Sequence, residues 1–138
     1  MIDTDIDSLD KIRNSTHARI YSPDNFVYTS QPTGNNFATA YHRCASDIID
    51  HFSDVFRKQM EACESLHAIQ LFHSLSGGAG SGIMSKLLNH VSDDCPKKII
   101  VTATGFPSGA ENSSDNTNLE IYNSILALHN IIEYPTLA

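Results

Sequence analysis

Basic residues are scarce in this chain. Nine Lys and Arg stand against sixteen Asp and Glu, which gives a formal charge of −7 over 138 residues. The nine are scattered, so no basic stripe is present that could neutralise a nucleic-acid backbone. We therefore predict no nucleic-acid partner.

Long apolar runs are also missing, and cysteine is rare. Met1 is followed by Ile-Asp-Thr-Asp rather than by a basic segment and an apolar stretch, so nothing indicates secretion or insertion into a membrane. The three cysteines are odd in number and show no Cys-x-x-Cys or zinc spacing. We interpret them as reduced thiols and predict a cytoplasmic location.

The composition favours one folded domain. Hydrophobic residues make up 41% of the chain and charged residues 18%, which is ordinary for a soluble α/β domain and unlike a disordered segment. No internal repeat or separable second domain is visible.

A long amphipathic helix is predicted over residues 41–63. Apolar residues recur there at intervals of three and four: Tyr41, Ala45, Ile48, Phe52, Val55 or Phe56, Met60 and Cys63. The preceding Gly34, Asn35 and Asn36 signal its start, since Asn is a favoured N-cap and Gly permits a tight turn.

The middle of the chain predicts a strand, a glycine turn, a helix and a second strand. Residues 66–72 are apolar, Ser76-Gly-Gly-Ala-Gly-Ser-Gly82 follows, and residues 83–91 show helical spacing. Cys95 and Pro96 end that helix, and residues 98–104 are typical of a β-branched strand buried on both faces. This order predicts a right-handed parallel unit.

A long polar loop is predicted over residues 105–118. A further helix is predicted after it, marked by the spacing of Leu119, Tyr122, Ile125, Leu126 and His129. Residues 131–138 resemble the beginning of another strand.

The glycine turn leaves two interpretations open. Four glycines between a strand and a helix let the backbone approach an anion, with the free N–H groups of the first helical turn directed at it. The same glycines could instead serve close packing of the helix on the strand. The turn is not a Walker A loop, because no Lys-Ser or Lys-Thr follows, and Ile83 breaks the Gly-x-Gly-x-x-Gly spacing.

The stretch of residues 73–82 closely resembles the signature loop of the tubulin family, Gly-Gly-Gly-Thr-Gly-Ser-Gly. Three further segments resemble that family in the same order: Ser22-Pro-Asp-Asn-Phe-Val27, Gly34-Asn-Asn-Phe-Ala38 and Glu120-Ile-Tyr-Asn-Ser-Ile-Leu126. The likeness is nearest to β-tubulin. Cys95-Pro-Lys-Lys98 and Phe106-Pro107 are more like γ-tubulin, so the residues assign no isotype.

The resemblance implies an α/β fold, a parallel-sheet, Rossmann-like GTP-binding domain over residues 1–138. It implies GTP and Mg²⁺ as cofactors and other tubulin-like subunits of a cytoskeletal filament as partners. The nucleotide-binding positions that it carries over are Gly34, Asn35, Asn36, Ser74, Gly77, Gly78, Ala79, Gly80, Ser81, Gly82 and Glu120, with Asp5 as the magnesium-associated residue and Asp3 nearby.

The chain also departs from the family pattern. Ala79 stands where Thr is usual, which removes a hydroxyl, and Ile121 stands in place of Pro. Met1 aligns inside a family loop, so we expect the fold to be incomplete, without the opening strand and the central helix. We expect no independent GTPase activity, because the loop that activates hydrolysis is also absent. No catalytic residue is assigned.

Two alternatives accompany this hypothesis. The chain could be a diverged tubulin fragment that binds no nucleotide and acts only as an interaction module. A dinucleotide-binding enzyme is disfavoured, because it needs an acidic residue about 20 positions after the glycine turn, and residues 99–104 contain none.

Overall fold

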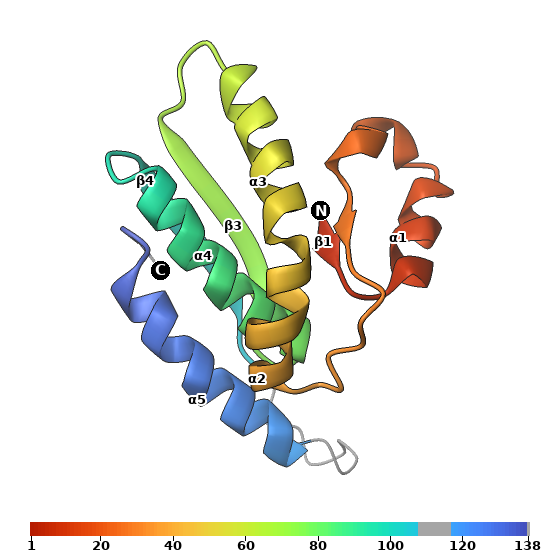
Figure 1. The fold of residues 1–138 in the computed structure, drawn as a ribbon, viewed down its shortest axis with the longest axis vertical. Helices are drawn as coiled ribbons and strands as arrows, with labels where there is room; N and C mark the ends of the chain where they lie inside the picture. The colour runs from red at the N-terminus through yellow and green to blue at the C-terminus, as the bar shows by residue number, and fades with distance from the viewer. Residues whose placement is uncertain (108–116, 138) are drawn as a thin grey trace.

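The computed structural model describes residues 1–107 and 117–137 and shows a mixed α/β fold with parallel strands (Figure 1). Two single-turn 3₁₀ helices, Ala18–Ile20 and Pro23–Asn25, lie in the N-terminal part. The helices and strands are, in chain order, β1 (Ile2–Asp3), α1 (Ile6–Arg13), β2 (Val27–Tyr28), α2 (Phe37–Thr39), the π-helical segment η3 (Ala40–Cys44), α3 (Ala45–Glu61), β3 (Ala68–Ser74), the π-helical segment η4 (Ala79–Ile83), α4 (Met84–Asp94), β4 (Ile99–Gly105) and α5 (Thr117–Glu133).

The strands form two separate two-stranded parallel sheets. β3 pairs with β4 from Ala68 opposite Ile99 to Ser74 opposite Gly105. β1 pairs with β2 through two residues each. The predicted strand, helix and strand therefore form a parallel unit, and α4 ends at Asp94 with Cys95 as its C-cap.

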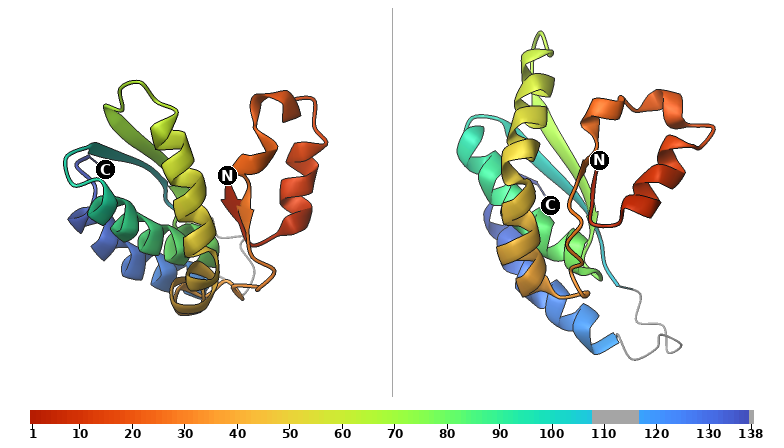
Figure 2. Two further views of the ribbon diagram at one scale, coloured as in Figure 1. Left: turned by 45° about the horizontal axis from the view of Figure 1, so that its top comes forward. Right: turned by 45° about the vertical axis from the view of Figure 1, so that its right-hand side comes forward.

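The helices α3, α4 and α5 lie on one side of the β3–β4 sheet (Figure 2). Ile100 and Thr102 are buried on that side, whereas Ile99 is exposed at 48% and Phe72 at 74%. The prediction that the strand over residues 98–104 is buried on both faces is therefore wrong. Only one face carries a layer of helices within the described residues, so the alternate side chains stay accessible.

The predicted long helix is confirmed as a continuous helical run, with α2, η3 and α3 following one another from Phe37 to Glu61. Its buried residues Ala40, Cys44, Ala45 and Ile48 pack with Val27, Ile83 and Leu87 in one core cluster. A second cluster joins α3 and α4 to the sheet. Its buried members are Ile69, Leu88, Val91, Cys95 and Ile100, with Phe52, Phe56 and Met60 packed against them.

The predicted final helix is confirmed, but the residues that mark it in the sequence are not the ones that it buries. Leu119, Tyr122, Ile125 and Leu126 are exposed, and so is His129. The buried residues of α5 are instead small, polar or both, except for one isoleucine: Asn123, Ser124, Ala127, Asn130 and Ile131. Apolar residues occupy several faces of this helix, so the spacing alone could not select the buried one.

The end of the chain agrees only in part with the predicted strand. α5 continues to Glu133, and Leu137 then forms a single parallel bridge to Val101. The expected long loop lies mostly at residues 108–116, outside the described residues.

Candidate functional site

The loop before the long helix contains two consecutive residues in the left-handed region, Gly34 at φ 58° and Asn35 at φ 54°. Asn36 then caps the helix, because its Oδ1 accepts hydrogen bonds from the N–H groups of Ala38 at 2.8 Å and Thr39 at 3.3 Å. The predicted N-terminal signal is confirmed. The tight turn leaves the backbone of Gly34 open, since a Cβ there would meet nothing within 4 Å.

The glycine turn is shorter than its sequence suggests. β3 ends at Ser74, and Gly78 already has helical dihedrals of φ −59° and ψ −43°. Within the described residues, Gly34 alone among the glycines has a positive φ. Gly77, Gly78, Gly80 and Gly82 are therefore not required for left-handed conformations.

Three of these glycines permit close packing. A Cβ on Gly78 would lie 2.8 Å from the backbone nitrogen of Asn36. A Cβ on Gly80 would lie 2.2 Å from the carbonyl oxygen of Ser74, and a Cβ on Gly82 would lie 2.5 Å from that of Phe37. No real Cβ contact is this short, so a side chain at Gly80 or Gly82 would push the helix away from β3 or α2. The packing interpretation left open above is correct for Gly78, Gly80 and Gly82.

Gly77 differs, because its surroundings are open. A Cβ there would meet only Asn35 Oδ1, at 3.8 Å. Gly78 lies closer to the neighbouring loop, and its N–H donates to Asn35 Oδ1 at 3.1 Å. The structure thus brings the loop of residues 33–36 against the turn of residues 76–78, although more than 40 positions separate them in the sequence.

The hydroxyl groups of the turn make local contacts. Ser81 is fully buried, and its Oγ donates to the carbonyl oxygens of Gly77 at 2.7 Å and Gly78 at 3.3 Å. Ser74 Oγ lies 2.9 Å from Ser76 Oγ at the exposed end of β3. Ala79, the position of the missing Thr hydroxyl, packs against the first core cluster.

Asn123 on α5 joins the loop and the turn, and it was not among the predicted site residues. Its side chain is 3% exposed. Its Oδ1 accepts from Phe37 N at 2.9 Å, and its Nδ2 donates to the carbonyl oxygens of Asn35 at 2.9 Å and Ser76 at 3.1 Å. The sequence signal was a polar stripe, Asn123, Ser124 and Asn130, on a largely apolar helix.

The other predicted position on this helix is Glu120, which is partly exposed one turn before Asn123. Its backbone carbonyl oxygen accepts from Ser124 Oγ at 2.7 Å. Both atoms of this hydrogen bond belong to α5, and Glu120 lies one helical turn from Asn123, which contacts the loop and the turn.

Asp5 lies in the N-terminal part and caps α1. Its Oδ1 accepts from Asp7 N at 3.2 Å and its Oδ2 accepts from Ser8 Oγ at 2.5 Å. The hydrogen bond from the Ser8 hydroxyl holds the pKa of the Asp5 carboxyl below its ordinary value. Within residues 1–107 and 117–137, no hydrogen bond joins Asp5 to either loop, and no group of three His, Cys, Asp or Glu residues could hold a metal.

His73 supports the turn from β3. Its Nδ1 lies 3.0 Å from the carbonyl oxygen of Gly80, so that nitrogen carries the donated proton, and its Nε2 lies 3.2 Å from Thr104 Oγ1. Burial lowers the pKa of His73, and the bond to Gly80 opposes that shift. Burial thus favours the neutral form of this imidazole, which lies between the turn and β4.

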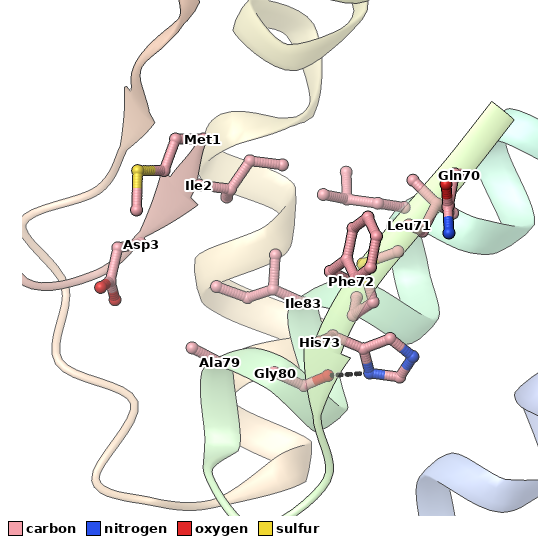
Figure 3. A pocket seen from close by; sticks show the side chains of 12 residues that line it. Met1, Ile2, Asp3, Gln70, Leu71, Phe72, His73, Ala79, Gly80 and Ile83 are labelled. Atoms are coloured by element: carbon pink, nitrogen blue, oxygen red, sulfur yellow. Dashed lines mark hydrogen bonds between the residues drawn. The ribbon is translucent and has the colours of Figure 1, made fainter. Parts of the chain in front are cut away.

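A cavity of about 540 Å³ lies between β1 and β3 (Figure 3). Ile2, Leu71 and Phe72 contribute apolar walls, and Ala79 and Gly80 border it from the helical end of the turn. Its mostly apolar lining does not suit a phosphate group. The two polar loops meet instead at Asn35 and Gly78.

The geometry defines a class of protein, an α/β domain in which a strand, a glycine turn and a helix meet an asparagine-bearing loop. The chain belongs to the tubulin/FtsZ family, because the model of that family's GTPase domain matches residues 1–137.

Two curated relatives are similar to most of the chain. It is 34% identical over 133 residues to the tubulin beta-6 chain of Gallus gallus and 32% identical over 133 residues to the tubulin beta-7 chain of Gossypium hirsutum. Each match covers 96% of this chain and 29% of the relative. The chain therefore spans less than a third of the length of these relatives.

None of the helices within the described residues is both long and apolar enough to cross a membrane.

Proposed function

We propose that this chain supplies the phosphate-facing part of a GTP site in a tubulin-type nucleotide-binding domain over residues 1–138. In this proposal the domain is Rossmann-like. The observation that carries the proposal is the contact between Asn35 Oδ1 and Gly78 N, which places two polar loops side by side.

The loops fit a phosphate group. Gly34 and Gly77 both present open backbone, where an added Cβ would meet little or nothing. The turn also lies at the N-terminal end of a helical run, where N–H groups and the helix dipole favour an anion. In the structure, Asn35 Oδ1 accepts a hydrogen bond from the N–H group of Gly78. A phosphate oxygen could accept from the same N–H group, so phosphate binding would displace the Asn35 side chain.

Each predicted residue takes a role in this proposal. Gly77, Gly78 and the preceding Ser74 would contact the phosphates from one side, and Gly34, Asn35 and Asn36 from the other. Gly80, Ser81, Gly82 and Ala79 hold the helix in place, and Glu120 would face the ribose.

Asp5 would contribute one carboxylate to Mg²⁺. This ion is commonly bound by one or two carboxylates together with substrate phosphates. Each Asp5 oxygen accepts one hydrogen bond in the structure, and a carboxylate has about four acceptor positions in all. A ligand position therefore remains on Asp5.

Membership of the family supports a cytoskeletal role in the cytoplasm, with other tubulin-like subunits as partners in a microtubule or related filament. GTP hydrolysis by the chain alone is not part of the proposal, since no described group is assigned as a catalytic residue. Both relatives described above are tubulin beta chains.

The test is a titration of the folded chain with fluorescent GTP in Mg²⁺, with ATP as competitor and a chelator control. The matched variant is Gly77→Ala, because the open space at Gly77 accepts a methyl group without strain. It should weaken GTP binding at least tenfold, about 1.4 kcal/mol, while the melting temperature stays unchanged.

Ala68→Ser is the control, since it adds one atom at the exposed start of β3, at the other end of the strand from the turn. It should bind GTP as the wild type does. Equal GTP affinity in Gly77→Ala and wild type would contradict the proposal, as would the absence of GTP-selective binding by a folded wild-type chain.

A specific observation supports a second function, an interaction module without nucleotide. Gly78 N and the Ser81 hydroxyl already have partners inside the protein, and Phe72 and Ile99 are exposed on the open face of the sheet. This function predicts that the folded chain binds no GTP and that Phe72→Ser reduces its association with other chains.

A further inference from the structure

Asn123 is the one side chain among the described residues that hydrogen-bonds both the loop of residues 33–37 and the turn of residues 76–78. Asn35 contacts the turn from its own side, but only through Gly78 N. Asn123 comes from a third element, α5, and contacts both segments through their backbones (Figure 1 shows α5 beside α2 and the start of α4).

The orientation of the Asn123 amide is fixed by its neighbours. Phe37 N is a donor and requires an oxygen, whereas the carbonyl groups of Asn35 and Ser76 require a donor. A flipped amide would place an oxygen against two carbonyl oxygens and an NH₂ against an N–H group. Asn is thus well suited to this position, because it combines one acceptor with two donors on a short side chain.

We propose that Asn123 is a positioning residue for the phosphate-facing site, which sets the separation between the loop and the turn. The proposal rests on the proposed function for its effect on GTP. Since the loop contributes Gly34 and Asn35 and the turn contributes Gly77, loss of the bridge frees each segment to move independently. The backbone groups of the two segments then no longer converge on one phosphate position.

Asn123 acts through backbone groups of Asn35, Phe37 and Ser76, which adjoin the residues proposed to contact the phosphates. Its own side chain is buried and is not proposed to contact the ligand. A purely structural role would change global stability without changing the loops in particular. The two roles are therefore separable by a local measurement.

The first measurement is amide hydrogen exchange of the wild-type 138-residue chain, followed by NMR. The Phe37 amide donates to Asn123 Oδ1 rather than to a helical carbonyl, so its exchange reports this bridge. We expect it to be protected at least tenfold relative to an unstructured amide. Exchange of Phe37 at the unstructured rate would overturn the proposal without any variant.

The variants are Asn123→Ala, which removes the bridge, and Asn123→Asp, which keeps its shape and loses both donors. Asn123→Ala should raise exchange at residues 35–37 and 76–78 at least tenfold more than at Ile48 in α3. Asn123→Asp should do so at residues 35, 36 and 76–78, because its carboxylate still accepts from Phe37 N. Both variants should weaken GTP binding at least tenfold. Asn89→Ala is the control, because it makes the same change at a partly buried asparagine of α4, whose Nδ2 donates to Tyr134 Oη at 3.2 Å rather than to the loop or the turn. It should leave both readouts unchanged.

Equal local exchange and equal GTP affinity in the Asn123 variants and the control would overturn the proposal while leaving the proposed function intact. A folded wild-type chain that binds no GTP would overturn the proposed function instead. In that case the exchange comparison still decides whether Asn123 positions the two segments.

Discussion

α3 and α5 are both helices of 17 residues, yet they pack in opposite ways. α3 buries Ala45 and Ile48 and packs Phe52 and Phe56 against the core. α5 buries Asn123, Ser124 and Ala127 and leaves Ile125 and Ile132 exposed at 59% and 79%.

This difference shows that two helices of the same length are held by different physical means. α3 is stabilised chiefly by removing apolar surface from water. α5 is held by hydrogen bonds to neighbouring backbone and by a small residue that permits close approach. Substitutions that keep hydrophobicity should therefore be tolerated differently on the two helices.

The largest effect on stability is expected on α3, whose buried residues are apolar. Ile48→Ala should reduce the free energy of unfolding by about 2 to 5 kcal/mol, because it removes a side chain that is 2% exposed and leaves a cavity. Urea unfolding followed by circular dichroism measures the change. The exposed neighbour Asp47→Ala is the control, and a loss below about 1 kcal/mol for Ile48→Ala would break the comparison.

The next largest effect on stability is expected on α5, at a small buried residue. Ala127→Leu should reduce the free energy of unfolding by about 1 to 3 kcal/mol, because Ala127 is fully buried against Leu75 and Ile131 and no space remains for a larger side chain. The same unfolding experiment applies. If the leucine raised stability, α5 would be underpacked, and the contrast with α3 would need another explanation.

The exposed apolar face of α5 should matter little to folding. Ile125→Gln should change the free energy of unfolding by less than about 0.5 kcal/mol, because the side chain is already mostly in water. It should also lower self-association in sedimentation velocity, since exposed apolar patches promote contacts. A strongly destabilised Ile125→Gln chain would show that α5 buries this face in solution.

The smallest expected effect is on the pH dependence of stability. It concerns His73 beside the glycine turn rather than α3 or α5. Burial lowers the pKa of His73, so the unfolded chain takes up the proton first as pH falls. Stability from this residue is therefore present above the unfolded pKa of about 6.5 and decreases below it.

The measurement compares urea midpoints of wild type and His73→Gln from about pH 7.5 to about pH 5.5. The wild type should lose more stability on acidification than His73→Gln does. A wild-type chain that gained stability relative to the variant at acid pH would contradict the sign.

Much of the fold could be predicted from the sequence. This was so where one physical effect, the burial of periodic apolar residues, dominated. Periodic large apolar residues predicted the helix that ends at Glu61, and Asn36 marked its start. The buried face of α5 did not follow, because its contacts depend on hydrogen bonds to Phe37 and Ser76, far away in the sequence.

The candidate site was predicted in a similar way. The resemblance located the two loops, and the structure places them side by side through Asn35 and Gly78. The resemblance could not show that Asn123 joins the two loops, since that role arises only when three segments meet in the fold. The roles of the glycines also required three-dimensional distances, as Gly80 shows.

The close approach at Gly80 and Gly82 affects how the motif can be interpreted in other chains of this family. Selection for a folded protein alone would retain glycine at these two positions, even in a lineage that had lost its ligand. Gly77 is under no such steric demand. Substitution at Gly77 in an otherwise intact motif would therefore be the more informative sign that nucleotide binding has been abandoned.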